Sequence, residues 1–209
     1  VVAARLGWSY GYPGALQSKS KYTVSELSRR QGKQKRHAIG TEAASRGAQR
    51  GAVYHAIMER IPLRNADLSI ESITAFAESL ISRGILTAEE ISSIDLRKIF
   101  LFLKSPLGLR MRRADRIYRE EAFNLLKEKD GEEVIIQGII DCYFTEKDKY
   151  TLVDFKSDFV TDKQESIDRL VEVYRPQLEL YKEALEQIRG ISVDEMYLYL
   201  FTIDRAVKL

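Results

Sequence analysis

"GIIDCYF", residues 138–144, and "LVDFKSD", residues 152–158, are the two stretches that decide the fold. Both are apolar runs rich in β-branched and aromatic residues, a pattern that predicts buried strands. Charges interrupt them at Asp141, Asp154 and Lys156. Side chains two apart in a strand share a face, so Asp154 and Lys156 should project together. Asp141, on the preceding strand of the expected hairpin, can reach the same point.

The chain around these strands divides into three regions of one domain spanning residues 1–209. Residues 1–64 are a basic helical and loop region, residues 65–116 are helical throughout with a stop before Pro106, and residues 117–209 hold the sheet. Helices before and after a short sheet predict an α/β sandwich.

Local patterns predict the individual elements. A helix start at 22–30, capped by Thr23 or Ser25 with Glu26, precedes a loop over 33–47 and a helix over 50–61. Strands are expected at 115–128, 133–146 and 149–160, followed by a helix from 164 that ends at Gly190 and a closing strand over 194–204.

Composition narrows the class of protein. The single cysteine, Cys142, excludes a disulfide framework, a four-cysteine zinc site and an iron–sulfur cluster built from this chain alone, and it suits a reducing cytoplasm. No apolar run approaches the roughly 18 residues of a membrane span. No G-x-x-x-x-G-K-[ST] motif is present, so an ATP site of the P-loop type is not expected here. Because the sequence begins "VVAARL" without methionine, we expect a fragment of a longer protein.

Basic residues are unevenly distributed. Residues 1–64 carry twelve Lys and Arg against three Glu, and a second cluster includes Arg110, Arg112 and Arg113. Such density is typical of a surface that binds a polyanion, most commonly nucleic acid. Ordinary solvated helix faces would explain the charge equally well.

The buried charges call for a cation. Two carboxylates packed together repel each other, and a divalent ion such as Mg²⁺ relieves that repulsion while leaving positions for water and phosphate oxygens. Such an ion can polarise a phosphoryl group and lower the pKa of a bound water. Lys156 could orient or deprotonate that water, or balance charge in the transition state. A structural Asp–Lys ion pair is the alternative.

The order of motifs resembles the PD-(D/E)XK nuclease superfamily in its RecB-like branch. The resemblance rests on the motifs Gly138-x-x-Asp141, Asp154-x-Lys156 and Gln177-x-x-x-Tyr181, and on an earlier helical histidine, His55, in "RGAVYHAIMERIP". Further segments, including "YTVSELSRR", "FLKSPLGLRMRRADRIYREEAF" and "YRPQLELYKEALE", look like landmarks of the C-terminal nuclease domain of the bacterial AddA helicase–nuclease family, from about residue 22 to residue 201.

The resemblance implies a small mixed central sheet flanked by helices and a metal-dependent DNA phosphodiesterase, an exonuclease domain of a helicase–nuclease that acts in break repair and recombination. It assigns Mg²⁺ or Mn²⁺ as cofactor, with His55, Asp141, Asp154 and the Phe155 carbonyl as ligands. Lys156 would be the catalytic lysine, and Gln177 and Tyr181 would support the site and the DNA strand from one helical face.

The resemblance also implies an acidic residue upstream. In "REEAF", direct register with the family's arginine–glutamate pair selects Glu120, with Ala122 where proline is usual. Strand alternation instead places Glu121 on the face of Phe123, and Glu120 with Ala122. We choose Glu120.

The resemblance implies three partners: DNA, the helicase domains of the same polypeptide and an AddB-type partner protein. The DNA would arrive as single strands delivered by the helicase motor, and no membrane partner is implied. Arg110, Arg112, Arg113 and Tyr181 are candidate DNA contacts. Two alternatives stay open: a nuclease-fold domain that only binds DNA or docks a partner protein, and a metal-dependent phosphatase acting on small molecules.

Overall fold

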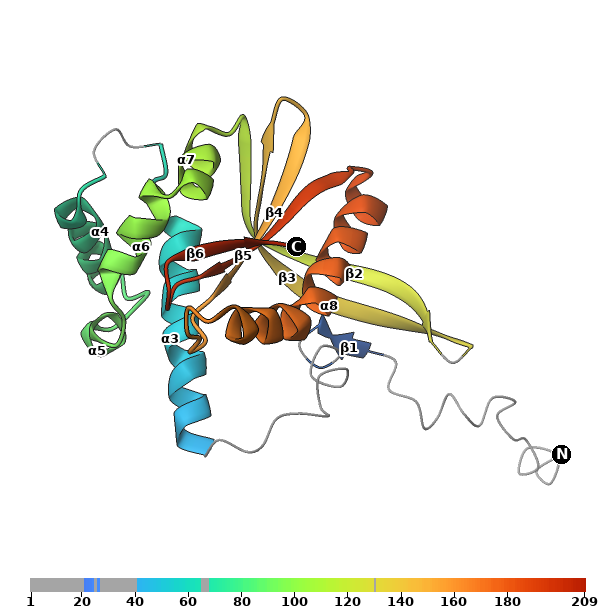
Figure 1. The fold of residues 1–209 in the computed structure, drawn as a ribbon, viewed down its shortest axis with the longest axis horizontal. Coiled ribbons are helices and arrows are strands. Elements are labelled where there is room, and N and C mark those ends of the chain that lie inside the picture. The colour runs from blue at the N-terminus through green and yellow to red at the C-terminus, as the bar shows by residue number, and fades with distance from the viewer. Residues whose placement is uncertain (1–20, 25, 27–40, 65–67, 130) are drawn as a thin grey trace, which may run out of the picture.

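The computed structural model describes residues 21–24, 26, 41–64, 68–129 and 131–209. Figure 1 shows a twisted sheet with helices on both sides, which confirms the predicted α/β class and the mixed sheet. Its elements are β1 (Lys21–Thr23), α3 (Thr41–Arg60), α4 (Ile70–Ser82), α5 (Ala88–Ser92), α6 (Leu96–Lys104), α7 (Pro106–Arg113), β2 (Arg116–Lys129), β3 (Glu132–Glu146), β4 (Lys149–Lys156), α8 (Gln164–Arg189), β5 (Val193–Leu200) and β6 (Arg205–Lys208).

Two hydrophobic clusters lie on opposite faces of the sheet. The first packs α3, α4, α6 and α7 against strand residues such as Phe144 and Phe155. The second packs α8 against residues such as Ile136 and Leu152. Each cluster removes a large apolar area from water, which is the main term that favours folding.

The helical region follows its capping signals. Thr87 accepts from the Glu90 amide and Glu90 reaches back, so α5 begins with a capping box. The predicted stop before Pro106 is confirmed, because α6 ends at Lys104 and Pro106 opens α7 as its first residue. Thr23 and Glu26 form a second capping box directly after β1.

The prediction for residues 41–47 is wrong. The predicted loop covers residues 33–47, yet α3 begins at Thr41, so residues 41–47 are helical and the helix predicted from residue 50 starts nine residues earlier. Alanines and Glu42 favour helix in this stretch, and one internal glycine costs only about 1 kcal/mol. Residues 33–40 of the predicted loop, and Ser25 as an alternative cap, lie outside the described residues.

β3 organises the sheet. β2 pairs with it antiparallel along one edge, while β1 and β4 occupy the other edge in succession, β1 beside residues 135–137 and β4 beside residues 142–146. β5 then runs parallel to β4, and β6 pairs antiparallel with β5. The predicted β2–β3–β4 meander is confirmed, whereas β1 and β6 were not predicted and the expected strand over 194–204 ends at Leu200.

α8 is the long helix predicted from residue 164, and it ends at Gly190 in the left-handed conformation (φ 65°). It contains Pro176, which removes one backbone hydrogen bond, and Figure 1 shows the helix bending along its length. Gln177 follows the proline directly, so the bend sets the direction of the helix at that side chain. Across the described part of the chain, no helix has the length and apolarity needed to cross a membrane.

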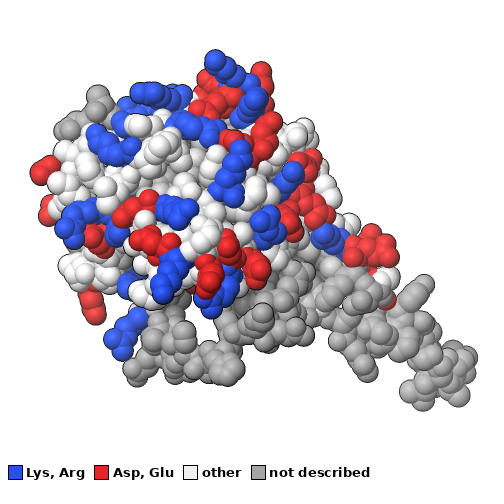
Figure 2. Space-filling model, viewed as in Figure 1, with Lys and Arg blue, Asp and Glu red and all other residues white. Residues whose placement is uncertain are grey.

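Charges of both signs are interspersed over the described surface in Figure 2. Of the twelve basic residues predicted to form a basic N-terminal region, those that the structure describes are Lys21, Arg46, Arg50, Arg60 and Arg64. The prediction of a basic N-terminal surface therefore falls mostly on residues outside the described ranges.

Candidate metal centre

His55 lies on α3 and faces the edge where β3 and β4 separate. Its Nδ1 is 3.2 Å from Glu120 Oε1 and 3.6 Å from Asp141 Oδ1, and its Nε2 is 3.2 Å from the Phe155 carbonyl oxygen. Burial alone would lower the pKa of His55, but the carboxylates of Asp141 and Glu120 raise it to about 9. Near neutral pH the imidazolium can therefore donate from both nitrogens.

Glu120 interrupts the alternation of β2. Its φ is 49°, in the left-handed region that costs a residue other than glycine about 1–3 kcal/mol. Ile117 before it packs against the α3 cluster, whereas Phe123 and Leu125 after it belong to the α8 cluster. A regular strand would keep these three odd-numbered residues on one face. Alternation therefore holds from Glu121 onward, where Glu121 shares the face of Phe123, but it is interrupted at Glu120.

Glu121 points away from His55. Its carboxylate accepts a hydrogen bond from the Tyr143 hydroxyl at 2.6 Å and pairs with Arg189 of α8. Of the two candidates for the upstream acidic residue, the structure brings Glu120 to His55 and holds Glu121 on the α8 side.

β3 switches faces at the same level as β2. Cys142 and Phe144 pack against the α3 cluster, while Ile136 and Ile140 belong to the α8 cluster. The register pairs Arg119 with Cys142 and Glu121 with Ile140, which sets Glu120 opposite Asp141. Like charges directly opposite each other destabilise a sheet. Backbone strain and charge repulsion thus coincide at one cross-strand pair.

Asp141 fills the opening between β3 and β4. The pairing of these strands ends at Cys142 and Val153, and beyond it Asp141 Oδ2 accepts a hydrogen bond from the Phe155 amide at 2.8 Å. The side chain thereby replaces a backbone acceptor that the diverging strand no longer offers. Its other oxygen, Oδ1, faces His55.

Asp154 and Lys156 share the α8 face of β4, as alternation predicts. Asp154 is 0% exposed; its Oδ2 is 2.6 Å from Lys156 Nζ and its Oδ1 accepts from Gln177 Nε2 at 3.2 Å. Gln177 also donates to the Tyr181 hydroxyl at 2.7 Å. The Lys156 ammonium lies 4.5 Å from the ring centroid of Tyr174, in cation–π geometry.

The two charges of this buried pair are perturbed in different ways. Burial raises the pKa of the Asp154 carboxyl, and Lys156 opposes that shift. Burial would lower the pKa of Lys156, but Asp154 and Asp141 raise it above its ordinary value. Lys156 therefore stays an ammonium near neutral pH.

His55, Glu120 and Asp141 can together hold a metal ion. Each offers one ligand atom, and these atoms all lie within 4.8 Å of one another. One imidazole and two carboxylates suit Mn²⁺ well and Mg²⁺ acceptably. Asp154, predicted as a ligand, lies outside this cluster; Lys156 Nζ is 2.6 Å from its Oδ2 and Gln177 donates to its Oδ1, and each carboxylate oxygen keeps a further lone pair for an ion.

Arg119 fixes the helix that carries His55. Its guanidinium Nη1 donates to the carbonyls of Met58 at 3.0 Å and Ile61 at 2.8 Å, which lie at the end of α3. The last carbonyls of a helix have no partner within it, and a cation there also suits the helix dipole. Sequence reasoning missed this link, as it missed Tyr174, which lies three residues before Gln177 and so on the same helical face.

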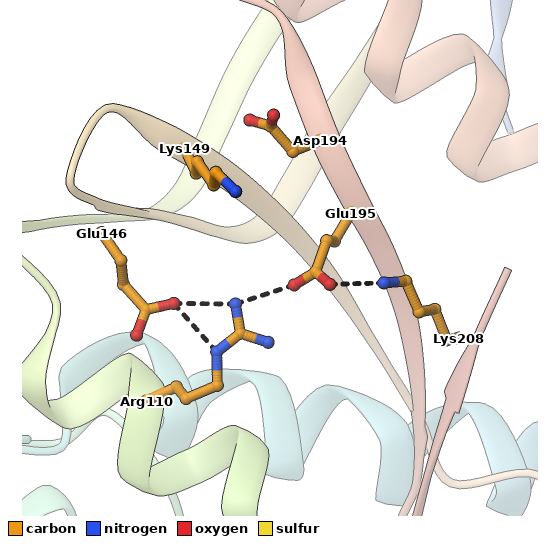
Figure 3. Close-up of a pocket in the computed structure, with 6 residues that line it drawn as sticks. All are labelled: Arg110, Glu146, Lys149, Asp194, Glu195 and Lys208. Atoms are coloured by element: carbon orange, nitrogen blue, oxygen red, sulfur yellow. Dashed lines mark hydrogen bonds and ion pairs between the residues drawn. The ribbon is translucent and has the colours of Figure 1, made fainter.

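The predicted DNA-contacting arginines lie on α7. Figure 3 shows the Arg110 guanidinium directed at Glu146 and Glu195, each 2.7 Å away. Arg112 donates to the Leu63 carbonyl, and the side chain of Arg113 is exposed. Glu146 is the last residue of β3, at the turn into β4. Lys156 lies at the opposite end of β4, about seven residues or roughly 23 Å further along the extended strand. The structure does not bring Arg110 to the His55 cluster.

Known proteins resemble this chain along nearly its whole length. Residues 16–207 match the family described as the PD-(D/E)XK nuclease superfamily. An ATP-dependent helicase/nuclease protein of Alkaliphilus oremlandii is 35% identical over 98% of this chain, and its counterpart of the same name in Syntrophomonas wolfei is 34% identical over 100% of it. The chain spans only 19% and 18% of the lengths of these relatives.

Proposed function

Since the chain belongs to the PD-(D/E)XK nuclease superfamily, we propose that it is a metal-dependent DNA phosphodiesterase. The observation that carries the proposal is the cluster of His55, Glu120 and Asp141 beside the buried Asp154–Lys156 pair. A structural ion pair alone would not explain a strained Glu120 facing a second carboxylate, because both features cost stability.

In this proposal His55, Glu120, Asp141, Asp154 and the Phe155 carbonyl hold one or more divalent ions, Mg²⁺ or Mn²⁺. When bound, such an ion polarises the phosphoryl group and makes hydroxide available near neutral pH. Asp141 has two roles, since one oxygen orders the Phe155 backbone while the other faces the ligand cluster.

Lys156 carries a positive charge beside the ligand cluster. Its raised pKa keeps the ammonium protonated, so it can orient the attacking water and balance the negative charge that grows on the phosphate oxygens. Tyr174 and Asp154 hold it in place from two sides.

Gln177 and Tyr181 position Asp154. The Gln177 amide bridges the Asp154 carboxylate and the Tyr181 hydroxyl, and both side chains are buried. We assign them a supporting role at the site, with Tyr181 as a further candidate for DNA contact. Arg112 and Arg113 stay candidates for contacts to the DNA backbone, while Arg110 would first have to leave two carboxylates.

The wider context is also a proposal. The relatives are named as components of an ATP-dependent helicase/nuclease, so we propose that this chain is the exonuclease part of such a protein, acting on DNA in break repair and recombination in the cytoplasm. Helicase domains of the same polypeptide would deliver single strands, and an AddB-type protein would be the partner.

The test is degradation of end-labelled single-stranded DNA in Mg²⁺, in Mn²⁺ and in EDTA. The matched pair is Glu120→Gln and Glu121→Gln: each removes one negative charge from adjacent residues, but only Glu120 faces His55. We expect Glu120→Gln and Lys156→Met to abolish metal-dependent cleavage and Glu121→Gln to retain it. If the wild type shows neither cleavage nor calorimetric binding of Mn²⁺, the catalytic proposal fails and a domain that only binds DNA or docks a partner protein becomes the better explanation.

A further inference from the structure

Phe159 is the most exposed large hydrophobic side chain in the described part of the chain, at 84%. It lies in the segment between β4 and α8, three residues after Lys156. An aromatic ring of this exposure contributes little hydrophobic stabilisation to the isolated chain, and its face is accessible to a ligand.

The backbone on both sides of Phe159 is fixed. The Asp158 carbonyl accepts from the Thr202 hydroxyl at 2.6 Å, and the Asp158 carboxylate accepts from the Tyr174 hydroxyl at 2.8 Å. Val160 on the other side is 4% exposed and belongs to the α8 cluster. With both neighbours bound to the protein, the Phe159 ring is presented to solvent by an ordered backbone.

This segment also borders the metal centre. It starts from Lys156, whose carbonyl accepts from the Phe201 amide at 2.9 Å. A Cβ added to Gly51, which lies one turn before His55 on α3, would be 3.3 Å from Ser157 Oγ. Three residues of chain reach at most about 10–11 Å, so the Phe159 backbone lies within that distance of the Lys156 backbone, at the border of the proposed site.

We infer that Phe159 is a stacking platform for a base of the DNA strand beside the scissile phosphodiester bond. This inference rests on the proposed nuclease function. An exonuclease without a sequence preference must bind every base, and stacking on an aromatic ring is sequence-tolerant because each base has a π-face. The Lys156 cation and the Phe159 ring would thus bind the two chemically different parts of a nucleotide, its phosphate and its base.

The experiment compares Phe159→Ala, Phe159→Leu and Phe159→Trp with the wild type. Leucine keeps the apolar volume without the π-face, and tryptophan keeps the π-face. The probe is a short single strand carrying 2-aminopurine, whose fluorescence falls on stacking. Affinity is measured in EDTA, and KM and kcat for cleavage are measured in Mg²⁺ or Mn²⁺.

We expect Phe159→Ala and Phe159→Leu to weaken binding and raise KM roughly tenfold, within the range of about 5- to 150-fold that one stacked base contributes. Both should lose the quenching, Phe159→Trp should keep it, and kcat should stay within about twofold for all three. If the wild type cleaves DNA but Phe159→Leu binds and quenches like the wild type, the stacking inference is wrong and the proposed nuclease function stands. A wild type that quenches through Phe159 but neither cleaves DNA nor binds Mn²⁺ would support the platform and overturn the nuclease; absence of DNA binding would overturn both.

Discussion

Asp141 uses its two oxygens for different purposes, and substitutions can separate them. Oδ2 accepts the Phe155 amide at 2.8 Å, and Oδ1 belongs to the ligand cluster with His55 and Glu120. Asp141→Asn removes the charge but keeps an oxygen that can accept the same amide. Asp141→Ala removes the charge and the acceptor together.

The expected difference in Tm follows from comparing the two variants. Both variants lose the same negative charge. The change in repulsion from Glu120 and in attraction to His55 is therefore the same in both variants and does not contribute to the difference between them. What differs is the buried Phe155 amide, which loses its partner only in Asp141→Ala and then costs about 1–3 kcal/mol. For a chain of this size 1 kcal/mol shifts Tm by about 2–4 °C, so Asp141→Ala should unfold roughly 2–12 °C below Asp141→Asn.

Two assays check this reasoning. Thermal unfolding in EDTA measures Tm and tests the hydrogen bond to Oδ2. Calorimetric titration measures Mn²⁺ affinity and tests Oδ1 as a metal ligand. Both variants should bind Mn²⁺ at least roughly tenfold more weakly than the wild type, since even outer-shell partners contribute about 10–100-fold to metal affinity. Equal Tm values for Ala and Asn would refute the structural role of Oδ2, and wild-type Mn²⁺ affinity in Asp141→Asn would refute the ligand role of Oδ1.

Three further predictions use other residues. Because the pKa of His55 is raised to about 9, a metal ion must displace its proton below that pH. Mn²⁺ affinity should therefore rise with pH up to about 9, and calorimetry in buffers of different ionisation enthalpy should show about one more proton released by the wild type than by His55→Gln; equal counts would contradict this. A Cβ on Gly138 would lie 2.5 Å from Phe123 Cε1, so Gly138→Ala should lower the urea unfolding free energy by about 1–3 kcal/mol and an added Phe123→Leu should restore part of it. No loss in the single variant would show that the ring moves freely. Burial raises the pKa of Cys142 to about 12, so iodoacetamide at pH 8 should label it, by mass spectrometry, only after unfolding in urea; labelling of the folded chain at the same rate would refute its burial.

The sequence predicted those parts of the fold that regular periodicity determines. The α8 boundaries, the β2–β3–β4 meander and the helical middle region follow from apolar spacing, caps and turn residues, which act locally. β1 and β6 have three and four residues, too few for a periodic pattern, and only their partner strands define them.

The candidate site departs from that periodicity. Alternation correctly placed Asp154 with Lys156 and Glu121 with Phe123, but it could not show that Glu120 faces His55, because no local signal reveals a left-handed backbone at a glutamate. The contact of His55 with the Phe155 carbonyl spans 100 residues of sequence, so only the resemblance to a family suggested it. Arg119 at the end of α3 is likewise a tertiary contact, which composition and spacing do not encode.

The facing carboxylates also bear on the order in which the molecule assembles. Glu120 and Asp141 belong to strands separated only by residues 130–131, so closing this hairpin brings the two charges together. Hairpins form in about 1–10 μs, whereas His55 is 65 residues from Glu120 and must arrive by slower, long-range docking of α3. The hairpin therefore closes against its own repulsion until a divalent ion or the helix compensates it. Folding of this domain should accelerate with Mn²⁺, which would make an ion at the proposed site an aid to assembly as well.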